Sequence, residues 1–171
     1  MKEMTKENLK ASLAGESQAH VKYQAFARQA DKEAMPNIAR LFRAVAHAEL
    51  VHATNHLREL GGIGKTVANL EAAVDGENFE VDEMYAAYLE VAELQDEKGA
   101  ARSMRYAVEA EKIHAGMYGD AKAVAETGED IQIGTVYICP VCGFTHIGEP
   151  PDRCPVCNAK KDRFKAFQSQ E

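Results

Sequence analysis

Two short motifs, each pairing a glutamate with a histidine, could bind metal ions. Glu49 precedes His52 by three positions, and Glu111 precedes His114 by the same spacing. In an α-helix, residues three apart project from one face, so each pair could hold one ion. One such motif arises often by chance, but these two recur in similar stretches 62 positions apart. The repetition predicts a binuclear metal site between two copies of one helical unit.

All four cysteines of the chain lie near its C-terminal end, in two Cys-x-x-Cys motifs. Cys139 and Cys142 form the first motif, and Cys154 and Cys157 form the second. Two such motifs complete a tetrahedral all-sulfur metal site rather than a disulfide framework. Zinc and iron both accept this geometry. The aromatic residues nearby and the Cys-Pro-Val-Cys-Gly sequence of the first motif favour iron.

A binuclear carboxylate site also needs glutamates from the other two helices of a bundle. Glu16 is the candidate on the first helix. Glu111 lies about 14 residues after the turn near residue 97, and Glu83 lies equally far before it, with Glu80 one helical turn beyond. This mixed set of oxygen and nitrogen donors suits iron or manganese. The seven predicted ligands are Glu16, Glu49, His52, Glu80, Glu83, Glu111 and His114.

Two tyrosines on the same helices could support the metal site. Tyr23 lies on the stripe of the first helix that carries Glu16 and His20, and Tyr88 lies on the third helix. A phenol near the ions could donate a hydrogen bond to a carboxylate or to an oxygen ligand. Ordinary packing is the alternative for both tyrosines.

Four long helices are required to position these residues. Pro36 suits the first turn of the second helix. Residues 63–78, which contain Gly64 and Gly76, are predicted to cross between two helix pairs, with room for a short helix at residues 67–74. Two tight connections and one long crossover are typical of a ferritin-like four-helix bundle. The fold class is therefore all-α with a small cysteine-rich module, divided into domains at residues 1–130 and 135–171. The expected helices cover about 5–31, 36–60, 79–94 and 96–126.

Composition narrows the class of protein further. The chain has 171 residues, of which 46% are apolar and 27% charged, so it can bury a core. Its net charge of −7 argues against nucleic acid or an acidic membrane surface as a partner. No apolar run is long enough to span a membrane, and the N-terminus has no signal-like stretch. We therefore expect a cytoplasmic protein.

The sequence resembles the rubrerythrin family over nearly its whole length. The resemblance implies a diiron centre on the seven glutamates and histidines and a rubredoxin-like iron centre on the four cysteines. It also implies that His52 binds one iron in the reduced state, where Glu83 binds it in the oxidised state. The segments that carry the resemblance are Gly15-Glu16, Ala48–His52, Glu80–Tyr85, Glu111–His114, Tyr137–Phe144 and Arg153–Asn158.

The same resemblance implies a peroxidase of the NADH peroxidase type that reduces hydrogen peroxide to water and protects against oxidative stress. Electrons would come from a rubredoxin or an NAD(P)H-dependent reductase and pass through the four-cysteine iron. Because the link between the two domains is short, we expect the electrons to enter the partner subunit of a head-to-tail homodimer.

Two other functions use the same residues. In a ferroxidase or iron-storage protein, the carboxylates would oxidise ferrous iron for deposition, but storage needs no attached electron carrier. Alternatively, the cysteine module could be a structural zinc ribbon on a helical scaffold. Metal analysis with a visible spectrum separates these alternatives from the peroxidase.

Overall fold

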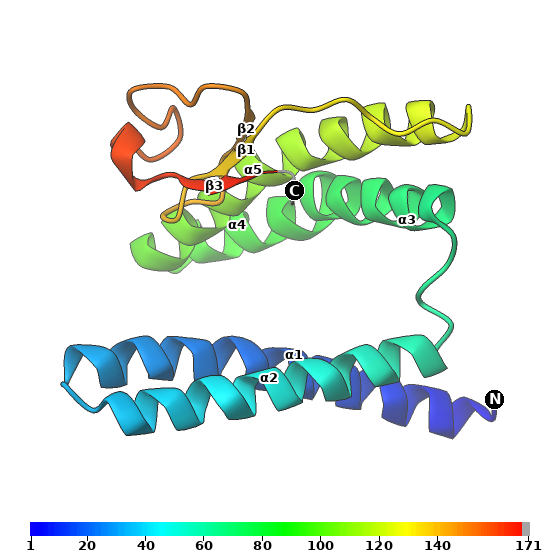
Figure 1. Ribbon diagram of the computed structural model, residues 1–171, viewed down its shortest axis with the longest axis horizontal. Coiled ribbons are helices and arrows are strands. Elements are labelled where there is room, and N and C mark those ends of the chain that lie inside the picture. Colours follow the sequence, from blue (N-terminus) through cyan, green and yellow to red (C-terminus); the bar gives the residue numbers. More distant parts are fainter. Residues whose placement is uncertain (169–171) are drawn as a thin grey trace. The chain divides into compact units, whose positions relative to one another are not determined.

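The computed structural model describes residues 1–168, and the chain forms two compact units, Met1–Gly64 and Lys65–Glu171. The first unit is a helical hairpin of α1 (Glu3–Lys32) and α2 (Pro36–Glu59), coloured blue to cyan in Figure 1. Pro36 stands at the start of α2, where its missing N–H costs nothing. The two helices begin and end close to the predicted positions.

Small residues line the contact between α1 and α2. Ala27, Ala39 and Ala46 are completely buried, and Ala30 and Ala53 nearly so. Alanine side chains let two helix backbones approach closely, because little volume separates them. This close packing brings side chains from the middle of α1 against the second half of α2.

The second unit contains a longer helix than the sequence predicted. α3 (Thr66–Phe79) continues through a π-helical turn (Glu80–Met84) into α4 (Tyr85–Leu94). The short helix allowed at residues 67–74 is thus present, but it is longer than expected and continuous with the next helix, so the predicted crossing at residues 63–78 is reduced to residues 60–65. Gly76 lies inside α3 and does not end it, because one glycine costs a helix only about 1 kcal/mol.

The π-helical turn inserts an extra residue into this helix. The backbone N–H of Tyr85 donates to the carbonyl of Glu80, five residues earlier, instead of to the residue four earlier. Each residue of such a turn rotates by less than the ~100° of an α-helix. Side chains on either side of the turn therefore face directions that a regular helix would not give them.

α5 (Lys98–Ala125) packs against α3 and α4, and a small sheet follows it. The strands are β1 (Val136–Ile138), β2 (Thr145–Ile147) and β3 (Lys165–Phe167), with a 3-10 turn at Lys161–Arg163. Both neighbours of the central strand β1 run antiparallel to it. The expected all-α class with a small C-terminal module is confirmed. No helix within residues 1–168 is both long and apolar enough to cross a membrane.

The segment between α5 and β1 returns along α5, as the yellow trace of Figure 1 shows. Ile131 and Ile133 of this segment share a cavity of about 750 Å³ with Met117 and Ala121 of α5. The link is therefore long enough to bring the module back onto α5 of its own chain, contrary to the premise on which electron entry into a partner subunit was expected. Ten extended residues span up to ~33 Å, whereas the helix from His114 to Ala125 is only about 17 Å long.

Candidate metal centres

The first carboxylate cluster lies in the α1–α2 hairpin. It contains Glu16 from α1 and the Glu49–His52 pair from α2. The His52 Nδ1 atom lies 3.0 Å from Glu49 Oε2 and 3.9 Å from Glu16 Oε1. One donor atom from each of the three residues lies within 4.8 Å of the others, so together they could hold one ion. The glutamates are the less exposed members, Glu49 with 16% of its side chain exposed.

A second cluster with the same composition lies in the other unit. It contains Glu77 from α3 and the Glu111–His114 pair from α5. The His114 Nδ1 atom lies 2.6 Å from Glu111 Oε2 and 3.9 Å from Glu77 Oε1. The two clusters thus repeat one geometry, in which each histidine directs Nδ1 toward two carboxylates, as expected from the duplicated motifs.

Glu77 is the residue that the sequence analysis missed. Position along a regular helix indicates the depth of a side chain but not the face of the helix that it occupies, and depth alone favoured Glu83. The 62-position offset could have found it, because it relates Glu16 to residue 78, next to Glu77. Glu80 lies close enough to Glu77 for their charges to interact, whereas Glu83 is exposed and belongs to neither cluster. Glu80 and Glu83 lie inside the π-helical turn, where Glu83 faces a direction that a regular helix would not give it.

The two tyrosines predicted from the sequence pack against other aromatic rings, and a different tyrosine lies near the second cluster. Tyr23 packs against Phe26 and Phe42, with ring centroids 6.1 Å away in both cases. Tyr88 is 49% exposed and stacks edge-on against Tyr85. Tyr85 is the tyrosine close to the second cluster.

The electrostatic environment of Tyr85 shows that it lies close to the carboxylates of the second cluster. Burial and the nearby carboxylates of Glu80, Glu111 and Glu77 raise the pKa of its phenol. The phenol therefore stays protonated and can donate a hydrogen bond into the carboxylate cluster.

The second cluster is electrostatically costly without a cation. Burial and the adjacent Glu111 carboxylate raise the pKa of Glu77 to about 7. Like charges held this close disfavour ionisation, and a divalent ion between them would remove the repulsion. Carboxylates together with imidazole nitrogens are the donors that non-haem iron accepts. The residues present therefore fit an iron ion in each cluster.

This arrangement predicts how pH affects the metal-free protein. The folded protein retains a proton on Glu77 that an unfolded chain, with a glutamate pKa near ~4.3, has already released. Its free energy of unfolding should therefore fall as pH rises from about 4.3 to about 7, by a few kcal/mol at most, and then level off.

Urea unfolding at pH 5 and pH 8 would measure this dependence. Glu77→Gln should reduce the difference between the two pH values, because glutamine cannot ionise. Glu71→Gln, in the same helix but at an exposed glutamate, should leave the difference unchanged. An equal pH dependence in the wild type and in Glu77→Gln would contradict the prediction.

The four cysteines form a compact cluster in the C-terminal module. Cys139 Sγ lies 3.5 Å from Cys157 Sγ, and Cys142 Sγ lies 3.4 Å from Cys154 Sγ. Disulfide sulfurs would be about 2.05 Å apart, whereas thiolates 2.3 Å from a central metal are separated by about 3.8 Å. All four are free thiols, and the cluster has the size of a tetrathiolate site.

Backbone groups prepare this site for thiolates. Burial raises the pKa of the Cys139 thiol, but hydrogen bonds from the N–H groups of Val141 and Cys142, together with those from the Cys157 and Cys142 thiols, outweigh it, so the pKa lies below its usual range. The N–H groups of Phe144 and Ala159 also bond to Cys142 and Cys157, where they oppose burial, which still raises the pKa of both thiols. Such N–H groups stabilise the negative charge of bound thiolates.

Comparisons with known proteins agree with both kinds of site. A family model described as "Rubrerythrin" matches residues 7–122, and one described as "Rubrerythrin, rubredoxin-like domain" matches residues 137–165. The chain is 44% identical to Rubrerythrin-2 of Clostridium acetobutylicum, over 96% of this chain and 97% of the relative. It is 37% identical to nigerythrin of Nitratidesulfovibrio vulgaris, over 95% of this chain and 86% of the relative.

Solved structures of nigerythrin are also similar. The superposition covers 95% of this chain and 86% of nigerythrin, with a TM-score of 0.54 and 35% sequence identity. The nigerythrin structures are described as mixed-valence, partially reduced and fully reduced with all iron ferrous. The likeness thus extends over both the helical part and the cysteine module.

Proposed function

We propose that this chain, which belongs to the rubrerythrin family, reduces hydrogen peroxide to water with electrons that enter through its four-cysteine site. One observation carries the proposal: the chain combines two Glu-Glu-His clusters with a tetrathiolate cluster. Oxidising iron for storage requires the carboxylates alone. A one-electron carrier built into the same chain supports repeated reduction of a substrate.

Iron is the cofactor of both kinds of site, as a diiron–carboxylate centre and as a rubredoxin-like centre. We assign the first centre to the six residues of the two Glu-Glu-His clusters, with Glu80 beside the second cluster. Glu83 was assigned from sequence alone, and Glu83→Gln tests it directly: loss of diiron occupancy would support a role as ligand. We assign the diiron domain to residues 1–130 and the rubredoxin-like domain to residues 135–171.

The reaction consumes two electrons and two protons for each peroxide, breaking the O–O bond and releasing two water molecules. When bound, the iron pair would supply these electrons and open positions for the peroxide oxygens. The four carboxylates of the two clusters balance the charge of two divalent ions. The Tyr85 phenol, close to the carboxylates of the second cluster, would be the hydrogen-bond donor for an oxygen bound there.

The donor that refills the four-cysteine site is proposed to be a reduced rubredoxin or an NAD(P)H-dependent reductase, in a cytoplasmic pathway. We also propose a homodimer or larger homo-oligomer. Exposed apolar side chains on the first hairpin, such as Phe26, Ile38 and Leu41, support an assembled state, because isolated proteins rarely leave such residues uncovered together. Size-exclusion chromatography with light scattering would test the assembly.

A single-turnover experiment tests the proposed reaction. The iron-loaded protein, fully reduced without oxygen, is mixed with one equivalent of hydrogen peroxide or with dioxygen. We expect peroxide to oxidise the protein faster, with the colour of the ferric tetrathiolate appearing as its electron is consumed. Faster reaction with dioxygen, together with accumulation of ferric mineral on adding ferrous iron, would instead support the ferroxidase function. A colourless module containing zinc would support the zinc-ribbon alternative.

A further inference from the structure

One side chain links the second carboxylate cluster to the cysteine module. The Nε2 atom of His114 lies 2.7 Å from the hydroxyl oxygen of Thr145 in β2. The same hydroxyl donates a hydrogen bond of 3.0 Å to the carbonyl of Gly143. Gly143 directly follows Cys142, one of the four thiol residues. A continuous series of bonds therefore connects a ligand of one metal site with a ligand of the other.

The direction of these hydrogen bonds decides which ring nitrogen of His114 carries the proton. A threonine hydroxyl has one proton, which Thr145 uses on the Gly143 carbonyl. It can only accept from His114, so Nε2 carries the proton of that ring. In a neutral imidazole the lone pair is then on Nδ1, the atom that faces Glu111 and Glu77.

Thr145 is held firmly in this position. It is 6% exposed, and it pairs with Ile138 in the β1–β2 ladder. Replacing it with a residue of similar shape would keep the packing and change only the hydrogen bonds.

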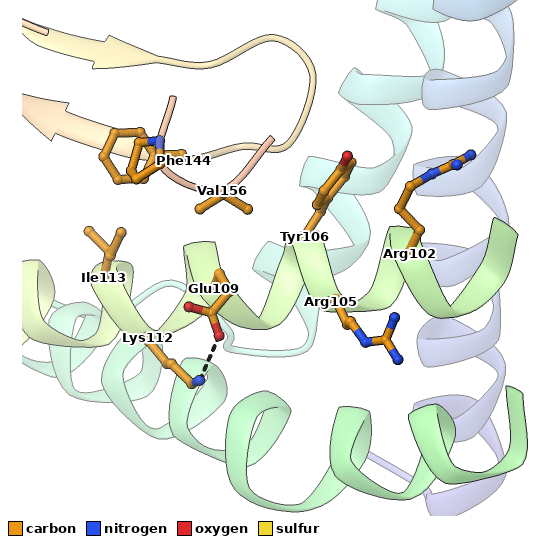
Figure 2. A pocket seen from close by; sticks show the side chains of 9 residues that line it. Arg102, Arg105, Tyr106, Glu109, Lys112, Ile113, Phe144 and Val156 are labelled. Atoms are coloured by element: carbon orange, nitrogen blue, oxygen red, sulfur yellow. Dashed lines mark hydrogen bonds and ion pairs between the residues drawn. The ribbon is translucent and has the colours of Figure 1, made fainter. Parts of the chain in front are cut away.

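The whole module rests on α5 beside this link. Phe144 and Val156 of the module lie next to Ile113 and Tyr106 of α5, as Figure 2 shows. At the same surface, a side chain added at Gly143 would contact Ala110 at 3.6 Å.

We propose that the Thr145 hydroxyl is a positioning group that holds His114 with Nδ1 free for iron, and that couples this histidine to the four-cysteine centre through Gly143 and Cys142. The inference rests on the proposed function, because it takes the Glu77–Glu111–His114 cluster as half of the diiron centre. Thr145 touches neither substrate nor metal and acts only through His114. Groups that orient a ligating histidine typically change metal affinity by 10–100-fold when they are removed.

The test uses the full chain with its four-cysteine site loaded with iron. Thr145→Val removes the hydroxyl and keeps the shape, whereas Thr145→Ser keeps the hydroxyl. Thr127→Val is the matched control, because the Thr127 hydroxyl also bonds to a backbone carbonyl, that of Val124, away from both sites. Cobalt(II) binding to the carboxylate centre, followed by its visible spectrum, reports histidine ligation without turnover.

We expect Thr145→Val to weaken cobalt binding by roughly 10- to 100-fold, with Thr145→Ser and Thr127→Val close to the wild type. In single turnover, Thr145→Val should also slow oxidation of the reduced four-cysteine iron. Cobalt affinity unchanged in Thr145→Val would overturn the proposal, and so would equal losses in the valine and serine variants. Failure of the proposed function would give a different result. In that case peroxide would not oxidise the reduced wild-type protein, whatever the cobalt affinities of the variants.

Discussion

Glu111→Gln should slow the peroxide-dependent oxidation of the reduced protein by more than ~100-fold, beyond the loss expected for a group that only orients a ligand. Glutamine preserves the size of the side chain but removes the negative charge that lies 2.6 Å from His114 Nδ1. The cluster then has one carboxylate fewer to balance a divalent ion. Stopped-flow oxidation by peroxide, together with iron content per chain, measures the effect.

Glu109→Gln is the matched control for this change. Glu109 lies two positions earlier on α5, where its exposed carboxylate pairs with Lys112, as the dashed line in Figure 2 marks. Its loss removes one charge from the same helix and should leave the rate and the iron content unchanged. Equal rates in Glu111→Gln and the wild type would remove this cluster from the mechanism.

Cys142→Ser should abolish turnover driven by an external electron donor and remove the visible absorption of the four-cysteine iron. Three of the four residues in the buried core of the module are cysteines, so the metal provides much of what holds the module together. Structural zinc in zinc-finger peptides, which are also small and metal-dependent, contributes about 10–16 kcal/mol of apparent binding free energy. Losing one of four thiolates should therefore unfold the module as well as empty it.

The diiron centre should survive this substitution. Chemically reduced Cys142→Ser protein, loaded with excess iron, should still react once with peroxide, because both carboxylate clusters keep their residues. Val141→Ser changes an exposed residue of the same motif and should keep colour and turnover. Donor-driven turnover that persists in a colourless Cys142→Ser protein would show that electrons bypass the module.

Much of the site could be predicted from the sequence because its signals are local. The spacing of Cys139 and Cys142 is set by a tight turn, and that of Glu49 and His52 by a single turn of helix, so neither depends on distant parts of the chain. Because the Glu-x-x-His motif occurs twice, a pair of metal ions was expected. Glu16 followed from the need for a carboxylate on the preceding helix, and the structure places it beside that motif.

Tertiary structure alone decided which carboxylate of the longer helix joins Glu111. Counting residues gives the depth of a side chain along a helix. Which side chain faces the neighbouring helix also depends on its rotation about the helix axis. The π-helical turn at Glu80–Met84 changes this rotation, and no distinct sequence pattern marks the turn. In the folded chain Glu77, one turn before the π-helical segment, lies in the cluster, and Glu83, inside that segment, is exposed. Likewise, no local pattern could place Thr145 against His114. These residues are 31 positions apart, and they meet only because the extended link is longer than the stretch of α5 that it retraces.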